Sequence, residues 1–408
     1  MRSLVPGEAF RVDELPTPGA AVAAYLRAVP LAPLGVELVS LAAAAGRVLA
    51  RDAVADVAYP ADDRSTMDGF AVRSSEGRAA RVIRGAVRMG HAPPHALGEG
   101  EAMRIPTGGV LPAGADAVVA WEDADEEAGT LTPHEAPAAG ESVTRRGDDM
   151  LAGDTVLHAG RRIGASELSV LATVGLAQVP VFRTPRIAIV STGDELIDPD
   201  SRPQTGQIRD SNRWAIAGAL IAAGCTPVHM PIGRDEPAEI AEQIAAGLAL
   251  ADGVILTGGS SVGGRDHTPA AIDACGAPGV IVHGIKVKPG KPTVLAAIGT
   301  KPVIGLPGNP ASALTILTAV CAPLLHAMTG ASEARGIATT AATEFAGRRG
   351  WTWYVPAVLD SAGARPLALR SSHTSLLARA DGYVIVGPEA GVIEAGAPLV
   401  LHRYGVQA

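Results

Sequence analysis

The amino-acid sequence contains, at residues 252–268, the stretch DGVILTGGSSVGGRDHT. Residues 253–257 are an apolar run with the length of a buried strand, and a loop with four glycines and three hydroxyl side chains follows. Glycines let the backbone approach a ligand closely, while N–H groups and hydroxyls donate hydrogen bonds to charged oxygens. The stretch therefore predicts a strand followed by an anion-binding loop.

Asp266 is the one acid in this loop. A carboxylate beside an anion is repelled unless it holds a divalent metal, accepts a proton or orients water. Asp266 therefore indicates chemistry rather than simple binding. The alternative is a glycine-rich surface loop in which Asp266 caps the next helix.

Composition limits the class of protein. The 408 residues are 47% hydrophobic and 19% charged, as expected for a folded chain of two to four domains. A net charge of −8 argues against a general nucleic-acid or membrane-surface role. The three cysteines lie far apart without metal-ligand spacing, and residues 1–19 lack the apolar core of a signal peptide. We therefore expect a cytoplasmic protein whose cysteines lie in its core.

Strands and helices alternate in the second half of the chain. The expected strands cover residues 187–190, 227–231, 253–257, 279–286 and 303–306. The expected helices cover residues 212–223, 238–249, 269–274 and 312–327. Such alternation predicts a mostly parallel sheet with helices on both faces, whose ligands bind at the carboxyl ends of the strands.

The other segments predict further domains. Apolar residues at helical spacing predict helices over residues 20–29, 39–50 and 166–174. Short runs separated by Gly and Pro predict strands over residues 70–72, 102–107, 117–121 and 129–132. The fold class is thus multi-domain α/β. It comprises a helical scaffold (1–58 plus 145–180), a β-rich insert (59–144), a central doubly wound α/β domain (181–329) and a small all-β C-terminal domain (330–408).

Two more loops carry polar groups to the expected crevice. Residues 287–293, VKPGKPT, place Lys288 and Lys291 on either side of a Pro-Gly turn, which suits an anion clamp. A solvated lysine turn is the alternative. Residues 306–310, LPGNP, join a strand to a helix, so that their N–H groups can face the same crevice.

Four acids are candidates for metal binding and proton transfer: Asp68, Glu195, Asp235 and Asp266. Glu195 lies in STGDE, residues 191–195, directly after an expected strand. Local alternatives exist for two of the four. Asp68-Gly69 is a common hairpin turn, and Asp235 has the position of a helix N-cap.

The motifs together resemble one family, molybdopterin molybdenumtransferase, which is related to the E domain of gephyrin. The resemblance covers about residues 45–405 and rests on seven stretches in the same order. They are DRSTMDGFAVR (63–73), PTGGVLPAGADAVV (106–119), STGDEL (191–196), GQIRDSN (206–212), GGSSVGGRD (258–266), KPGKP (288–292) and GLPGNP (305–310).

The resemblance implies an enzyme that inserts molybdate into adenylylated molybdopterin and releases AMP with the help of Mg²⁺. It implies a homodimer with composite active sites and contact with other proteins of molybdenum cofactor synthesis. The implied catalytic residues are Asp68, Thr107, Glu195, Asp235 and Asp266, with Asp235 and Asp266 on the metal. The implied cofactor-binding residues are Gly258, Gly259, Ser260, Ser261, Gly263, Lys288, Pro289, Gly290, Lys291, Pro292, Asn309, Ser371 and Ser372.

Two alternatives remain open at this point. Arg265 to Pro269, RDHTP, is similar to molybdopterin adenylyltransferases, although those enzymes lack the insert and the C-terminal domain. The second alternative is a non-catalytic scaffold that binds the pterin. The chain also departs from the family pattern at Pro356, where an arginine is often found.

Overall fold

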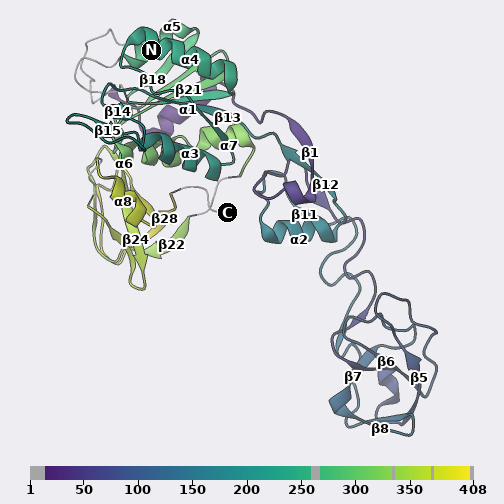
Figure 1. Ribbon diagram of the computed structural model, residues 1–408. Coiled ribbons are helices and arrows are strands. Elements are labelled where there is room, and N and C mark those ends of the chain that lie inside the picture. Colours follow the sequence, from purple (N-terminus) through teal and green to yellow (C-terminus); the bar gives the residue numbers. More distant parts are fainter. Residues whose placement is uncertain (1–13, 259–266, 333–335, 369–371, 405–408) are drawn as a thin grey trace. The chain divides into compact units, whose positions relative to one another are not determined.

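A computed structural model gives the fold of residues 14–258, 267–332, 336–368 and 372–404. Two compact units divide the chain (Figure 1). The first comprises Met1–Ala50, Gly160–Gly164 and Gln178–Ala408, and the second comprises Arg51–Ala159 and Ala165–Ala177. Each unit has hydrophobic cores of its own.

A six-stranded sheet in the order β16-β13-β17-β21-β20-β18 forms the centre of the first unit (Figure 1). Its strands are β13 (Arg186–Ser191), β16 (Thr226–His229), β17 (Gly253–Thr257), β18 (Pro278–His283), β20 (Val294–Ile298) and β21 (Lys301–Leu306). Among these, β20 alone runs opposite to the rest. The predicted mostly parallel sheet is confirmed. The sequence interpretation does not include β20, although its residues are nearly as continuously buried as those of β17.

Helices cover both faces of this sheet, because alternate residues of each strand point to opposite sides. Ile187 and Ile189 pack in a core with α1, α3 and α7, whereas Ala188 and Val190 pack with α4 and α5. The helices of this layer are α1 (Pro18–Ala28), α3 (Asn212–Ala222), α4 (Pro237–Leu250), α5 (Thr268–Cys275), α6 (Pro310–Thr315), the π-helical turn η5 (Ile316–Val320) and α7 (Ala322–Thr329).

The helix expected over residues 39–50 is wrong. Residues Val36–Ser40 form strand β1, which pairs antiparallel with β12 (Gln178–Phe182), and a single 3₁₀ turn, η2 (Leu41–Ala43), follows. Gly46 then adopts φ +76, a left-handed conformation that ends any helix. Pairing with β12 satisfies the backbone of β1, so this tertiary contact overrides the local helical spacing.

The helix expected over residues 312–327 is broken. The segment Pro310–Val320 meets Ala322–Thr329 at a bend of 51°. Pro323 lacks the N–H that a continuous helix requires, and a π-helical turn precedes it. In the described part of the chain no single helix has the length and apolar character to cross a membrane. The two segments of this bent pair have them only when taken together.

The C-terminal residues of the first unit form a second six-stranded sheet, in which β25 pairs with β24 at the side of the path β19-β24-β26-β28-β22. Its strands are β19 (Val287–Lys288), β22 (Ile337–Thr340), β24 (Thr352–Asp360), β25 (Gly363–Pro366), β26 (Gly382–Val386) and β28 (Pro398–His402). The short pair β23 (Phe345–Ala346) and β27 (Val392–Ile393) and the helix α8 (Thr374–Arg379) complete this part. Strand β19 comes from the lysine turn, so the turn and this sheet share backbone hydrogen bonds.

The second unit is rich in strands, as predicted. Its largest sheet has the order β7-β4-β6-β5-β9-β8. The strands are β4 (Gly69–Val72), β5 (Arg81–Ala86), β6 (Glu101–Ile105), β7 (Ala117–Ala120), β8 (Ala124–Glu127) and β9 (Thr130–Pro133), with 3₁₀ turns η3 (Ser74–Glu76) and η4 (Trp121–Asp123). Two short pairs join β2 (Ala53–Val54) to β11 (Thr155–Leu157) and β3 (Arg64–Ser65) to β10 (Val143–Thr144), and α2 (Ala165–Thr173) lies in the same unit. The four-domain division is finer than these two units and stays a prediction.

A charge cluster fastens β3 to the segment after β10. Asp63 accepts hydrogen bonds from the Arg146 N–H and the Arg145 guanidinium, both at 2.8 Å. Burial alone would raise the pKa of Asp63, but these hydrogen bonds outweigh it and hold the pKa below its ordinary value. The pair therefore stabilises the fold while Asp63 is ionised.

We expect the stabilising effect of Asp63 to depend on pH. Because its folded pKa is depressed, the contribution is complete above the unfolded pKa of about 3.9 and is lost as the pH falls through the folded value. Thermal unfolding of Asp63→Asn should therefore show a lower melting temperature than wild type at pH 7, and the difference should shrink as the pH falls below the unfolded pKa. The neighbouring exposed Asp62 provides the control, Asp62→Asn; equal losses in both variants at pH 7 would contradict the assignment.

Candidate functional site

Four loops meet at the carboxyl edge of the parallel strands. They follow β13, β16, β17 and β21. The N–H of Thr192 donates to the Thr257 carbonyl at 3.0 Å, and the N–H of Gly193 donates to the Gly233 carbonyl at 3.1 Å. These bonds extend the sheet pairing beyond the strands. The loop of STGDE therefore lies between the loop after β16 and the end of β17.

Gly258 begins the glycine-rich loop in a conformation that other residues rarely adopt. Its φ is +102, and a Cβ built on it would lie 1.9 Å from the Thr192 carbonyl oxygen. A Cβ on Gly308, in the loop after β21, would lie 3.7 Å from the Gly258 Cα. The backbones of three loops thus approach each other closely, and Gly258 is required at this position.

Asn212, the first residue of α3, joins the end of β17 to the loop after β21. Its Nδ2 donates to Thr257 Oγ1 and to the Gly308 carbonyl, both at 2.8 Å. The sequence interpretation places Asn212 in the motif GQIRDSN but assigns it no role. A polar residue that opens a helix looks like an ordinary cap, so no local signal distinguishes it.

The predicted acids of the first unit lie in or beside these loops. Glu195 is exposed, and its carboxylate folds back over the loop, since a Cβ on Gly193 would lie 2.7 Å from Glu195 Oε2. Asp235 is partly buried in the loop after β16. Asp266 lies outside the described residues, as do Gly259, Ser260, Ser261 and Gly263.

The interpretation of Asp235 as a helix cap is wrong. The N-cap of α4 is Glu236, and its side chain makes no capping bond. Instead, Glu239 in the first turn accepts a hydrogen bond from the Arg234 N–H at 3.0 Å. Asp235 therefore precedes the capping position, and Glu239 satisfies the backbone there.

The lysine turn emerges at the same edge of the sheet, because it follows β18, which runs in the same direction as β17. Strands are spaced about 4.8 Å apart, so the three steps from β17 to β18 span about 14 Å. Lys288 is exposed, and its Nζ lies 4.1 Å from the ring centroid of Trp353 in β24. Lys291 is partly buried.

Prolines and close packing shape this turn. Pro289 and Gly290 are buried, whereas Pro292 is partly buried. A Cβ on Gly290 would lie 2.3 Å from the Ile316 side chain, at φ +107. Thr293 Oγ1 donates to the Gly290 carbonyl at 2.7 Å. The turn is thus fixed against η5. It therefore holds the ammonium groups of Lys288 and Lys291 on a rigid backbone.

Asp68 and Thr107 come together within the second unit. Asp68 Oδ1 accepts hydrogen bonds from the Thr107 N–H at 2.7 Å and from Thr107 Oγ1 at 3.0 Å, and both residues are exposed. The hairpin interpretation of Asp68-Gly69 is wrong. Gly69 instead begins β4, and a Cβ there would lie 2.0 Å from the Val119 carbonyl oxygen. Close strand pairing therefore explains this glycine.

The remaining predicted residues are dispersed. Asn309 is the exposed N-cap of α6, and Ser372 is exposed, whereas Ser371 lies outside the described residues. The described residues hold no group of three or more His, Cys, Asp or Glu side chains placed to bind a metal. A Mg²⁺ ion needs fewer, because it commonly takes one or two carboxylates together with substrate phosphates.

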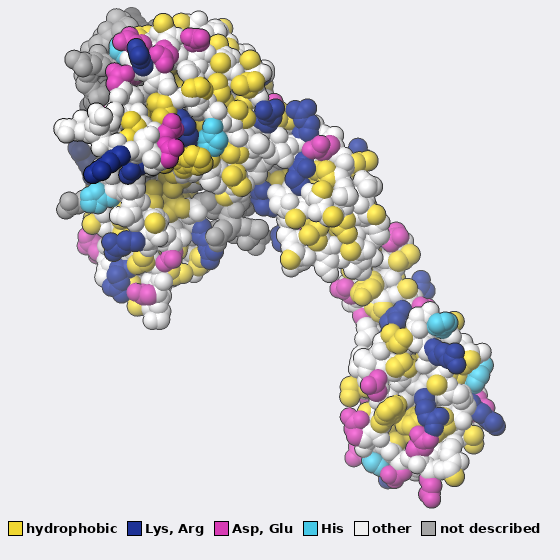
Figure 2. Space-filling model, viewed as in Figure 1, with side chains coloured by type: hydrophobic (Ala, Val, Ile, Leu, Met, Phe, Trp, Pro, Cys, Tyr) yellow, Lys and Arg dark blue, Asp and Glu magenta, His cyan; other side chains and the backbone are white. Residues whose placement is uncertain are grey.

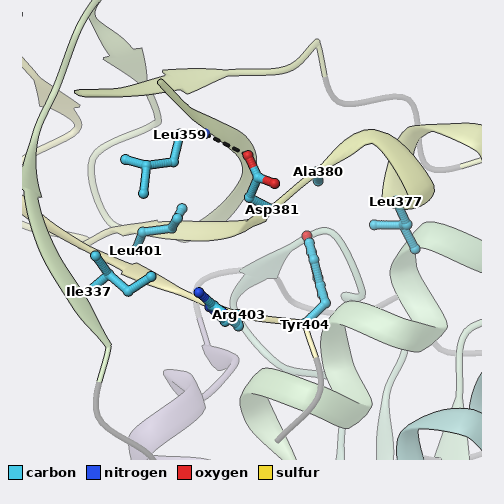
Figure 3. A pocket seen from close by; sticks show the side chains of 8 residues that line it. All are labelled: Ile337, Leu359, Leu377, Ala380, Asp381, Leu401, Arg403 and Tyr404. Atoms are coloured by element: carbon cyan, nitrogen blue, oxygen red, sulfur yellow. Dashed lines mark hydrogen bonds between the residues drawn. The ribbon is translucent and has the colours of Figure 1, made fainter. Parts of the chain in front are cut away.

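A separate pocket of about 440 Å³ lies in the C-terminal part of the first unit (Figure 3). It has apolar walls that include Leu359 and Leu401, and Asp381 Oδ2 accepts the Leu359 N–H at 2.7 Å (Figure 3). None of the predicted site residues lines it. This pocket is therefore not the place where the sequence motifs meet.

Cysteine chemistry does not contribute to the site. Cys225 and Cys321 are buried, and burial raises the pKa of each thiol to about 12. Both thiols therefore stay protonated at neutral pH and are poor nucleophiles. The predicted place in the core is confirmed for these two cysteines, whereas Cys275 at the end of α5 is only partly buried.

The geometry predicts the outcome of adding one methyl group at Gly258. We expect Gly258→Ala to destabilise the fold by about 1–3 kcal/mol, because the φ is unfavourable and the methyl group meets the Thr192 carbonyl. Gly218→Ala is the matched control, since Gly218 lies in α3 with open space around its Cα and should gain about 0.5–1 kcal/mol. Urea unfolding measures both, and a Gly258→Ala variant as stable as wild type would contradict the close contact.

Comparison with known proteins agrees with this arrangement. Residues 17–175 match the MoeA N-terminal region (domains I and II), and residues 188–327 match a probable molybdopterin binding domain. A crystal structure of the molybdopterin biosynthesis MoeA protein from Pyrococcus horikoshii shares 30% identity, covers 96% of this chain and 99% of its own, and superimposes with a TM-score of 0.77.

Two relatives have similar sequences over most of their length. The molybdopterin molybdenumtransferase of a Nostoc species is 36% identical over 73% of this chain and 70% of the relative. The molybdopterin molybdenumtransferase of Haemophilus influenzae is 30% identical over 91% of this chain and 95% of the relative. Because both domains and most of the length agree, the chain belongs to the molybdopterin molybdenumtransferase family, whose members are transferases of molybdenum cofactor biosynthesis.

Proposed function

We propose that this enzyme inserts molybdate into adenylylated molybdopterin and releases AMP in a Mg²⁺-dependent reaction. The observation that carries the proposal is the meeting of four loops at the carboxyl edge of the parallel sheet in a chain of this family. The P–O bond between the adenylyl phosphorus and the molybdopterin phosphate breaks, the molybdopterin phosphate leaves, and an oxygen from molybdate or water completes the phosphate of AMP. The two dithiolene thiols then bind molybdenum in place of oxygens, which leave as water with the thiol protons and protons from solvent.

The loops after β17 and β21 would hold the phosphates of this substrate. Their glycines, beginning with Gly258, allow close backbone approach, and N–H groups suit charged oxygens. Lys288 and Lys291 would meet molybdate or the terminal phosphate, with Pro289 and Pro292 fixing the turn. Each charge-assisted hydrogen bond of this kind contributes about 1.5–3 kcal/mol when water is excluded.

Asp235 and Asp266 would hold Mg²⁺, and Glu195 would support them. When bound, the ion neutralises phosphate charge and acts as a Lewis acid at the breaking bond. Carboxylates are ligands that this hard cation prefers. Asp235 lies in the loop after β16, and Gly233 of the same loop accepts the N–H of Gly193. The loops therefore supply suitable donors.

We further propose a homodimer in which Asp68 and Thr107 of one copy complete the site of the other. Their mutual hydrogen bonds fix an exposed carboxylate, which suits an incoming ligand. We expect the enzyme in the cytoplasm, in contact with other proteins of molybdenum cofactor synthesis. Positive and negative side chains are interspersed over the face drawn in Figure 2, in accord with small-molecule substrates rather than nucleic acid.

The reaction itself can be tested directly. We expect purified protein to release AMP from adenylylated molybdopterin only when molybdate and Mg²⁺ are both present, as chromatography of the nucleotide would show. The adenylyltransferase alternative predicts a different result: adenylylated product formed from molybdopterin and ATP without molybdate. Pterin binding with no turnover under any condition would favour the scaffold.

A matched pair of variants separates Asp266 from acids that only support the fold. Asp266→Asn should abolish AMP release while pterin binding survives, because the metal loses a charged ligand. Asp252→Asn is the matched control. Asp252 lies before the opposite end of β17, where its Oδ2 accepts the Arg186 N–H at 2.9 Å. Unchanged turnover in Asp266→Asn, or equal losses in both variants, would contradict the role of Asp266.

A further inference from the structure

The side-chain amide of Asn212 has a forced orientation. The atom that lies 2.8 Å from the Gly308 carbonyl oxygen must be a donor, because a carbonyl oxygen only accepts. It is therefore Nδ2, and its second hydrogen is available for Thr257 Oγ1 at 2.8 Å. One amide thus uses both of its hydrogens to join the last residue of β17 to the loop after β21.

This contact sets the direction of the next peptide group. The Gly308–Asn309 peptide is trans, so its N–H points opposite to its C=O. Because the Gly308 carbonyl points toward Asn212, the Asn309 N–H points away from α3. Gly308 and Asn309 are both exposed, and neither N–H donates a hydrogen bond to another group in the described residues.

The first turn of α3 holds Asn212 in place. Asp210 Oδ1 accepts the Arg213 N–H at 3.1 Å, and the two side chains form an ion pair with Nε and Oδ2 3.1 Å apart. Both side chains are nearly inaccessible, at 1% and 10% exposed. Asp210 Oδ2 and Arg213 Nε are not aligned as a hydrogen bond, but the two charges lie in direct contact. In the sequence these two residues flank Asn212.

We propose that Asn212 is a positioning residue that presents the Asn309 N–H to an oxyanion of the substrate. This inference rests on the proposed function, since the oxyanion is a phosphate oxygen of adenylylated molybdopterin on which charge develops as the P–O bond breaks. Asn212 itself touches no substrate. It acts through the Gly308 carbonyl, and a fixed N–H aimed at developing charge favours the transition state over the ground state.

The test replaces the donor without changing its size. Asn212→Asp puts a carboxylate oxygen against the Gly308 carbonyl, which repels it and turns the peptide. We expect kcat for AMP release to fall about 10²-fold, in the range for loss of one oxyanion donor, with little change in KM. A readout that needs no turnover is the NMR resonance of the Asn309 amide during titration with inorganic pyrophosphate. It should shift in wild type and not in Asn212→Asp.

Ile216→Val is the matched control for a purely structural effect. Ile216 lies on the buried side of α3 and is fully buried, so its variant should lower the melting temperature and leave kcat and the Asn309 shift unchanged. A wild-type kcat in Asn212→Asp would overturn the proposal. An Asn309 amide that shifts in Asn212→Asp as it does in wild type would also overturn it. Absence of AMP release in wild type would instead overturn the proposed function, and the amide titration would still decide the role of Asn212.

Discussion

The close approach of Gly258 to the carbonyl of Thr192 is the constraint on which the candidate site depends. Strands β13 and β17 pair in parallel to their last residues, and the pairing continues into the loops as the bond from Thr192 to Thr257. Only a residue without a side chain fits between these backbones. Gly258 therefore fixes where the chain leaves β17 relative to the loop after β13.

Much of the fold follows from the sequence because each layer has a local signature. Strand β17 has the bounds that its apolar run predicts, and α3 and α4 begin and end close to their predicted limits. The failures occur where long-range pairing decides. Residues 39–50 carry helical spacing, yet residues 39 and 40 end β1, which pairs with β12, and Val48 and Leu49 form bridges to Arg162 and Val181, far along the chain. A single-sequence pattern contains no information about those partners.

The candidate site is predictable in part for the same reason. Loops at the carboxyl ends of parallel strands must share one edge, so STGDE, the glycine-rich loop and LPGNP are brought together by topology alone. The contact between Asp68 and Thr107 is likewise found within one unit. Asn212 escapes prediction, because its importance lies in two acceptors that are 45 and 96 residues away.

The pairing of β19 with β24 makes the lysine turn a shared element of two sheets. Val287 and Lys288 align with Thr352 and Trp353, and the ring of Trp353 lies beneath the ammonium group of Lys288. A truncated enzyme that stopped after the α/β layers would leave β19 without its neighbouring strand and Lys288 without its aromatic support. The C-terminal sheet is consequently an integral wall of the lysine turn, and no minimal α/β fragment of this chain keeps that turn intact.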